Sequence, residues 1–126
     1  MILDTNALSA LADGDATLLP VLGRTADLAL PVIVLGEYLF GIRKSRHRTR
    51  YEQWIEGVVL PNFQLLTVEE ETASHYASLR QELQTVGLPI PSNDLWIGAL
   101  ARQHRLPVVS RDRHFDAVKG LRRVSW

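Results

Sequence analysis

The chain contains no cysteine among its 126 residues, which excludes a disulfide framework, a thiolate metal site and a cysteine nucleophile. It also lacks a long apolar run. The longest, residues 28–35, is far shorter than the about 20 residues that cross a bilayer, and it contains Pro31. The first residues show no basic segment followed by an apolar one, so we expect no signal peptide, no membrane partner and a cytoplasmic location.

Lysine is scarce as well, with two lysines against 12 arginines. The chain holds 14 basic and 14 acidic residues. If four of the acids gather in one site, the remaining ten leave an excess of four positive charges elsewhere. Arginine is the better bidentate ligand for phosphate, although a biased codon composition would produce the same ratio. The composition therefore leaves binding to a nucleic acid open.

The remaining composition is that of a globular protein, with 46% hydrophobic and 22% charged residues. A chain of this length can bury one real core. No repeat, linker or low-complexity segment divides it, so we expect a single domain over residues 1–126.

Short apolar segments alternate with helical patterns along the chain. We expect strands at residues 2–3, 28–30, 63–68 and 107–110, with a possible edge strand in 121–126. Alternation of this kind predicts an α/β fold: a mainly parallel central sheet of four or five strands, flanked by helices on both faces as a three-layer sandwich. Helices are expected at residues 7–12, 16–24, 32–42, 51–60, 69–86 and 95–101.

Residue spacing predicts two buried helix faces, and residue type predicts two helix caps. The helix at 32–42 should bury one face and the helix at 51–60 another. Thr5 and Asn6 are suited to cap the first helix, and Ser92 or Asn93 the helix that starts beside Asp94. The residues expected on the two buried faces are Val32, Leu35, Leu39 and Ile42, and Tyr51, Trp54, Ile55 and Val58.

Four acidic residues stand at positions that the expected topology brings together. Asp4 and Asp112 follow two strands directly, at the sheet edge where open α/β sheets bind ligands. Asp94 lies in the first turn of a helix, and Glu37 lies among apolar helix residues. Taken singly, each acid is typical of a cap or an exposed residue. Crowded together, however, they would need cations, because like charges raise one another's pKa.

An oxygen-only site of this kind suits Mg²⁺ or Mn²⁺, with waters and a substrate phosphate completing the coordination. Such a site lowers the pKa of a bound water and stabilises a leaving oxygen. It therefore supports in-line displacement at phosphorus.

The order of these residues resembles the PIN-domain ribonucleases, and among them the VapC toxins of bacterial toxin–antitoxin pairs. The resemblance spans nearly the whole chain. It rests on the segments Leu3-Asp4-Thr5-Asn6, Gly36-Glu37-Tyr38, Asn93-Asp94-Leu95-Trp96-Ile97 and Ser110-Arg111-Asp112, the last running into His114-Phe115.

The resemblance implies a PIN-like fold in which the acidic quartet of Asp4, Glu37, Asp94 and Asp112 holds Mg²⁺ or Mn²⁺ and activates water. It also implies an RNA substrate and a VapB-like antitoxin as partner. By the same resemblance, Asn6 and Ser110 orient the first carboxylate. Asp116 is a further acid whose part is left open.

Two surface segments are candidates for contacts outside the site. The densest basic run either follows an RNA backbone or is only a solvated connection; its charged members are Arg43, Lys44, Arg46, Arg48 and Arg50. Helices on either side of this run can form a groove for an amphipathic helix of the antitoxin, in a toxin that we expect to be a homodimer. The groove residues would be Leu39, Phe40, Tyr51, Trp54 and Ile55.

Three functions remain open on the sequence. The first is a metal-dependent endoribonuclease toxin inhibited by a cognate antitoxin. The second is an RNA-binding module with an inactive site, against which the intact quartet argues. The third is a metal-dependent DNA nuclease or phosphatase. A phosphoaspartyl phosphatase would be expected to carry Asp-x-Asp after its first strand, and Asn6 stands at the second of these positions. The RNA target and the number of metals do not follow from the sequence.

Overall fold

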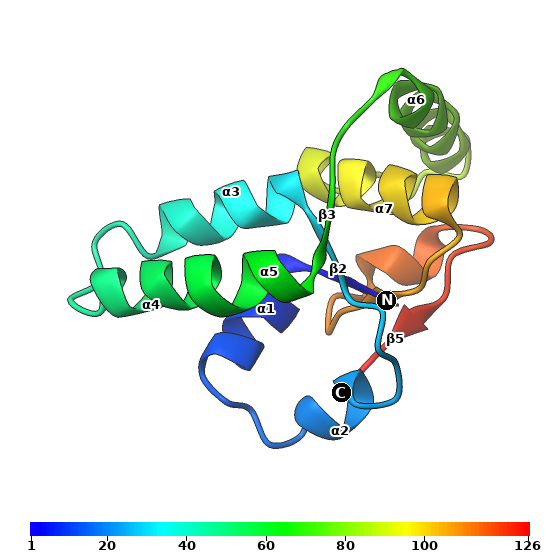
Figure 1. Ribbon diagram of the computed structural model, residues 1–126. Helices are drawn as coiled ribbons and strands as arrows, with labels where there is room; N and C mark the ends of the chain where they lie inside the picture. The colour runs from blue at the N-terminus through cyan, green and yellow to red at the C-terminus, as the bar shows by residue number, and fades with distance from the viewer.

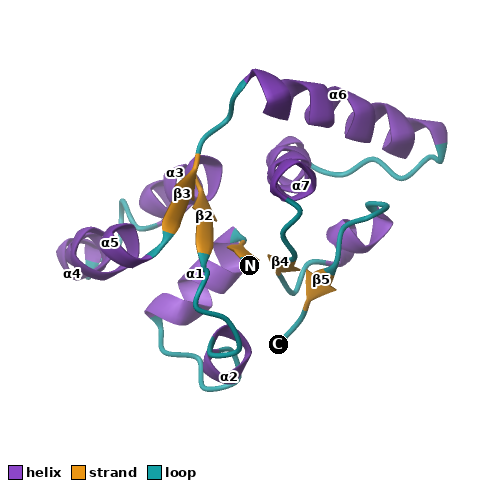
Figure 2. Ribbon diagram, turned by 45° about the vertical axis from the view of Figure 1, so that its right-hand side comes forward, coloured by secondary structure: helices purple, strands orange, loops and turns teal.

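Five short strands form one parallel sheet in the computed structural model, which describes residues 1–126. The spatial order is β3-β2-β1-β4-β5, so the first strand lies at the centre of the sheet (Figure 2). The expected parallel sheet and its edge strand at the end of the chain are thus confirmed. The strands are β1 (Ile2–Leu3), β2 (Ala29–Pro31), β3 (Gln64–Leu66), β4 (Val108–Val109) and β5 (Arg123–Val124).

Helices connect the strands and lie on both sides of the sheet, as Figure 1 shows. None of them has both the length and the apolar character that crossing a bilayer requires. The helices are α1 (Thr5–Ala12), α2 (Leu19–Leu22), α3 (Val32–Gly41), α4 (Arg48–Trp54), the π-helical turn η1 (Ile55–Val59), α5 (Leu60–Asn62), α6 (Glu70–Thr85), α7 (Ser92–His104) and the 3₁₀ turn η2 (Arg113–Ala117).

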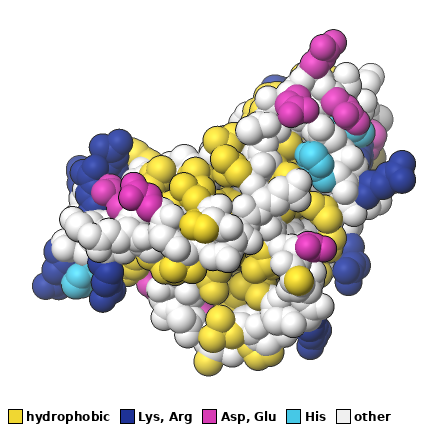
Figure 3. All heavy atoms as spheres, in the orientation of Figure 1, with side chains coloured by type: hydrophobic (Ala, Val, Ile, Leu, Met, Phe, Trp, Pro, Cys, Tyr) yellow, Lys and Arg dark blue, Asp and Glu magenta, His cyan; other side chains and the backbone are white.

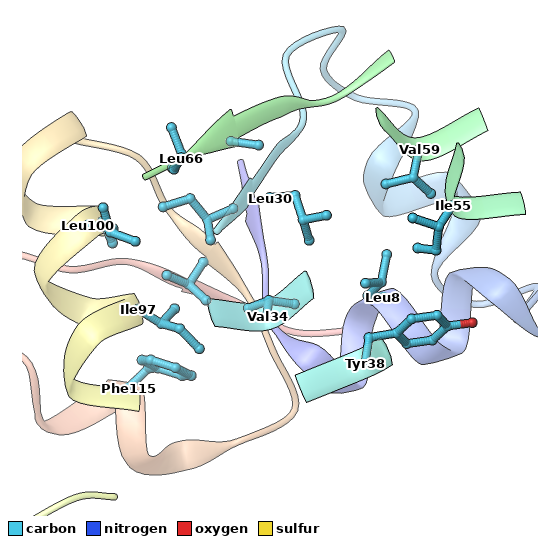
Figure 4. Packing of buried hydrophobic residues seen from close by; sticks show 14 of the residues in the cluster. Leu8, Leu30, Val34, Tyr38, Ile55, Val59, Leu66, Ile97, Leu100 and Phe115 are labelled. Carbon is cyan, nitrogen blue, oxygen red and sulfur yellow. The ribbon is translucent and has the colours of Figure 1, made fainter. Parts of the chain in front are cut away.

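The sheet separates two apolar clusters because successive strand residues point to opposite faces. Ile2 belongs to the larger cluster, which takes Val34 from α3 and Leu100 from α7 (Figure 4). Leu3 belongs to the smaller cluster, with residues of α1 and α2. Two layers of helices around one sheet give the predicted three-layer arrangement.

The face expected to be buried on α3 is confirmed only at its end, where Ile42 is buried. Val34 and Tyr38 are the other buried residues, whereas Val32 is exposed and Leu35 and Leu39 are only half-buried. Helix α3 contacts both α1 and α7, so apolar residues occur around most of its circumference. Residue spacing alone therefore could not identify the innermost face.

The stripe predicted after the basic run was wrong at its last position. Val59 is fully buried and Val58 is exposed. The reason is the wider π-helical turn η1, which shifts the positions that follow Ile55 relative to an α-helix. Before that turn the expected stripe lies inward: Tyr51 and Trp54 are half-buried and pack on the larger cluster.

Neither of the two expected caps is present. Helix α1 begins at Thr5, so Asp4 itself is the N-cap, and its carboxylate accepts a hydrogen bond from the backbone N–H of Ala7. Helix α7 begins at Ser92 after the extended Pro91, with no side-chain cap. As a consequence, Asp4 is fixed at the junction of β1 and α1.

Candidate active site

All four acids of the predicted quartet line one polar cleft of about 460 Å³. The cleft lies where β1 and β4 end, beside α3 and the N-terminus of α7. Apart from Pro91, its walls are formed by polar and acidic residues: Asp4, Thr5, Asn6, Glu37, Ser92, Asn93, Asp94 and Asp112.

Asp4 is the most deeply buried of the four acids, with 4% of its surface exposed. The Ala7 N–H donates to its Oδ1 over 2.8 Å, and the Ser110 hydroxyl donates to its Oδ2. Burial raises the pKa of the Asp4 carboxyl, and the charges of Asp94 and Asp112 raise it further, while the two hydrogen bonds oppose the shift. This carboxylate is therefore held in place but short of positive charge.

Glu37 is held by a residue whose role the sequence did not reveal. The Thr5 hydroxyl donates to Glu37 Oε1 over 3.0 Å, joining α1 to α3 across 32 residues of chain. Thr5 was expected only as a helix cap. Its position directly after Asp4 was the available signal, but the contact depends on how α1 and α3 pack.

Asp94 and Asp112 meet at the imidazole of His114. His114 Nδ1 lies 3.1 Å from Asp94 Oδ2 and 3.0 Å from Asp112 Oδ1. Burial raises the pKa of Asp94, as do the nearby charges of Asp112 and Glu37, and the His114 contact opposes the shift. Asp112 also caps η2, since its Oδ1 accepts from the His114 backbone N–H over 2.9 Å.

The two residues expected to orient Asp4 are placed differently. Ser110 is fully buried between Asp4 and the backbone N–H of Asp112, which donates to its hydroxyl over 2.9 Å. Asn6 is exposed in the cleft wall, and the hydrogen bonds of Asp4 go to Ala7 and Ser110 instead. An orienting role for Asn6 therefore has no contact to support it.

Asp116 lies outside the cleft lining and binds Arg123. The Arg123 Nε and Nη2 atoms donate to its two carboxylate oxygens over 2.7 and 2.9 Å, and these bonds lower the pKa of Asp116. Arg123 Nη1 also donates to the backbone carbonyl of Ser110 over 3.0 Å. Asp116 thus holds the arginine that braces Ser110, and has no direct contact with the quartet.

The residues present fit a divalent cation. No lysine or arginine forms an ion pair with any of the four acids, although all four line the same cleft. Carboxylate oxygens are the ligands preferred by Mg²⁺ and Mn²⁺. Burial raises the pKa values of Asp4 and Asp94, and the charges of neighbouring acids raise them further; a bound divalent cation would favour the ionised carboxylates.

The first three residues of the basic run, Arg43, Lys44 and Arg46, lie in the connection between α3 and α4, and Arg48 and Arg50 lie in the first turn of α4. Figure 3 shows Lys and Arg side chains gathered at this end of the molecule. Arg43, Lys44 and Arg46 are exposed. Arg48 pairs with Glu52 over 2.6 Å, and Arg50 lies over the ring of Tyr51 at 5.4 Å from its centroid.

One of the expected groove residues is not available to a partner. Ile55 is 2% exposed and belongs to the core, on the buried face that it shares with Tyr51 and Trp54. Phe40, in contrast, is 81% exposed at the end of α3. Leu39, Tyr51 and Trp54 are half-buried, and the Trp54 ring lies 6.2 Å from that of Tyr38.

The PIN domain family profile matches residues 1–121. The chain belongs to the PIN-domain family. Ribonuclease VapC5 of Mycobacterium tuberculosis is 34% identical over an alignment of 129 positions, which covers 98% of this chain and 90% of that relative. Ribonuclease VapC2 of Rickettsia felis is 26% identical, with 99% and 96% covered. The resemblance inferred from the four acidic segments is confirmed.

Solved structures of PIN-domain toxin–antitoxin complexes share the fold over nearly the whole chain. VapBC2 from Rickettsia felis, bound to a promoter DNA fragment, matches with a TM-score of 0.86 at 25% identity, covering 99% of this chain and 97% of that one. FitAcB from Neisseria gonorrhoeae matches with a TM-score of 0.86 at 27% identity, covering 97% and 94%. The PIN-like fold class is therefore confirmed as well.

Proposed function

We propose that this PIN-domain protein is a VapC-type toxin, an endoribonuclease that needs Mg²⁺ or Mn²⁺ and is inhibited by a VapB-like antitoxin. The observation that carries the proposal is the polar cleft, in which four acids from separate parts of the chain meet without a lysine or arginine partner. Relatives named as ribonucleases support RNA as the substrate, which would place the action in the cytoplasm.

The chain's own residues would prepare the site before the ion binds. Ser110 and Ala7 fix the carboxylate of Asp4, and Thr5 fixes that of Glu37. Asp94 and Asp112 complete the quartet of ligands. Held in this way, the four groups lose little freedom on binding an ion, and they stay aimed at one point. The bound ion would supply an activated water and stabilise the leaving oxygen at phosphorus.

The basic connection between α3 and α4 supports contact with the RNA backbone. Arg43, Lys44 and Arg46 are exposed and form no ion pair, so their charges are free for phosphate. Arg48 is already paired with Glu52 and should add less. We assign phosphate contact chiefly to the first three residues.

The partner is proposed from the solved neighbours, which are toxin–antitoxin complexes. In this chain the exposed Phe40 and the half-buried Tyr51 and Trp54 lie on the two helices that border the basic connection. An apolar helix face of an antitoxin could cover them. A homodimer, as expected from the family, stays a prediction.

Cleavage assays on matched RNA and DNA strands test the proposal. The purified chain should cut RNA when Mg²⁺ or Mn²⁺ is added and stop when EDTA is added. Glu37→Gln should abolish cutting because it removes a charged ligand, whereas Glu56→Gln, an exposed acid of η1 outside the cleft, should not. Full activity in EDTA, or cutting of DNA alone, would contradict the proposal.

A further inference from the structure

His114 occupies a position that the quartet does not explain. Its Nδ1 atom lies 3.1 Å from Asp94 Oδ2 and 3.0 Å from Asp112 Oδ1. The chain has four histidines, and His114 is the one that contacts the quartet, from just outside the cleft lining. Its ring therefore bridges two of the acids that surround the proposed metal.

The backbone around His114 fixes this position on both sides. The Asp112 carboxylate caps η2 through the His114 N–H, and the following residue, Phe115, is fully buried in the larger core cluster. The backbone that carries the imidazole is thus held beside Asp94 and Asp112 by a cap and a core anchor.

The three ligand atoms of Asp94, Asp112 and His114 lie within 4.8 Å of one another. Neighbouring ligands of an octahedral ion with bonds of about 2.1 Å are about 3.0 Å apart, because they form the edge of an octahedron. The two His114 distances have this length. Hydrogen bonds have it too, so the same arrangement can serve the metal-free and the metal-bound site.

We propose that His114 is itself a ligand, through Nδ1, of the divalent ion held by Asp94 and Asp112, and that it shifts the preference of the site from Mg²⁺ toward Mn²⁺. This rests on the proposed metal-dependent function. Mg²⁺ is a hard ion that selects oxygen ligands, whereas first-row transition ions accept an imidazole nitrogen. In the ligating form the ring is neutral and carries its proton on Nε2, which leaves the Nδ1 lone pair for the ion.

The proposal competes with a simpler role for the ring, that of a counter-ion. If His114 only bridges the two carboxylates, an entering ion must displace it. Removing the ring would then strengthen the binding of every divalent ion. If His114 is a ligand, its removal weakens Mn²⁺ binding and affects Mg²⁺ less. The two roles therefore predict changes of opposite sign.

Metal binding without RNA decides between them. Mn²⁺ affinity would be measured on the full chain by the loss of the free-ion EPR signal, and Mg²⁺ affinity by competition against Mn²⁺. His114→Ala should lower the Mn²⁺ affinity at least about tenfold and reduce the ratio of Mn²⁺ to Mg²⁺ affinity. His114→Asn, which offers an oxygen, should keep Mg²⁺ binding and lose the preference for Mn²⁺.

Pulsed EPR can test directly whether a histidine nitrogen is bound to Mn²⁺. Pulsed EPR on bound Mn²⁺ should show coupling to a ligand nitrogen in the unmodified chain and no such coupling in His114→Ala. His104→Ala, which removes an exposed histidine at the end of α7, should retain the coupling. Thermal melts would verify that all variants are folded.

Four results would overturn the proposal. Equal strengthening of Mn²⁺ and Mg²⁺ binding in His114→Ala would make the ring a counter-ion. Unchanged affinities in that variant, or bound Mn²⁺ without nitrogen coupling in the unmodified chain, would make it a bystander. Absence of any Mn²⁺ binding by the unmodified chain would also contradict the proposed metal site. RNA cleavage that needs the quartet while nitrogen coupling is absent would leave the proposed function standing.

Discussion

The Ser110 hydroxyl donates a hydrogen bond to the buried carboxylate of Asp4, across 106 residues of sequence. The contact exists because β1 and β4 are parallel neighbours, with Leu3 paired to Val109. Both strands therefore end at the same edge of the sheet. The same hydroxyl accepts a hydrogen bond from the Asp112 N–H. One side chain therefore fixes two members of the quartet.

Replacing Ser110 by alanine should disturb the site at Asp4. The carboxylate would stay buried with Ala7 as its remaining donor, and a hydrogen bond that lowers its pKa would be lost. We expect the free energy of unfolding to fall by about 1–3 kcal/mol, measured by urea denaturation. Mn²⁺ affinity should fall too, and Ser110→Thr, which keeps the hydroxyl, should retain it. Equal Mn²⁺ affinity in all three proteins would show that Ser110 does not position Asp4.

The raised pKa of Asp94 predicts how pH affects the stability of the metal-free protein. Between its usual value of 3.8 and its raised value, the folded state binds more protons at this group than the unfolded state. The contribution of Asp94 to stability therefore decreases as the pH rises through that range. Asp94→Asn, which cannot ionise, should be more stable than the unmodified chain at pH 7.

This advantage should shrink as the pH falls and vanish near 3.8, measured by denaturant unfolding at a series of pH values. Added Mn²⁺ should reverse the order, since it stabilises only a protein that keeps its ligands. A stability difference that is independent of pH would contradict a raised pKa of Asp94 in the folded state.

The sequence was sufficient to predict the α/β architecture and the acidic quartet. Both depend on strong local signals: apolar strands that end at Asp4 and Asp112, and a nearly all-apolar helix that begins beside Asp94. Parallel topology then brings the strand ends to one edge without any further information. Glu37 had weaker local support than the other three acids, because a glutamate on a partly buried helix is by itself typical of a solvent-facing residue.

The features that sequence reasoning missed depend on packing between elements. The bond from Thr5 to Glu37 requires α1 to lie against α3, which no local pattern encodes. The exchange of Val58 for Val59 at the buried position requires a π-helical turn, and such turns have no simple residue signature. The role of Asp116 was left open because its ion pair with Arg123, seven residues later, could not be recognised.

The basic connection should determine how RNA binding depends on salt. Binding would be measured in a Glu37→Gln background, so that the substrate stays intact. Combined replacement of Arg43, Lys44 and Arg46 by serine should reduce the salt slope by about 2, at about 0.7 for each phosphate contact on a single strand. Arg48→Ser should change it less, because Arg48 is paired with Glu52.

Arg24→Ser is a suitable control, since Arg24 is exposed just after α2 and far along the chain from the basic connection. In the triple variant, affinity should weaken for all RNA sequences. The same three replacements in the active chain should leave the cut position unchanged. A slope that does not change in the triple variant would show that the run is only a solvated connection.

Phe40 is the better residue for testing the partner surface. Trp54 packs against Tyr38 in the core, so its removal would destabilise the chain as well as weaken any contact. Phe40 is 81% exposed, and Phe40→Ser should therefore leave the melting temperature and RNA cleavage unchanged. Aromatic anchors of interfaces contribute about 2 kcal/mol or more, so inhibition by the co-encoded antitoxin should weaken at least about 30-fold.

The measurement is titration of RNA cleavage with purified antitoxin, with Leu19→Ser as a matched control because Leu19 is another exposed apolar residue, on α2. Sedimentation of the toxin alone distinguishes whether Phe40 lies in the contact between two copies of the chain or in the contact with the antitoxin. If the unmodified chain is a dimer and Phe40→Ser is a monomer, the residue lies in the contact between copies. If both proteins are dimers and only inhibition is lost, Phe40 lies under the antitoxin. Unchanged inhibition and an unchanged oligomeric state would place both partners away from the end of α3.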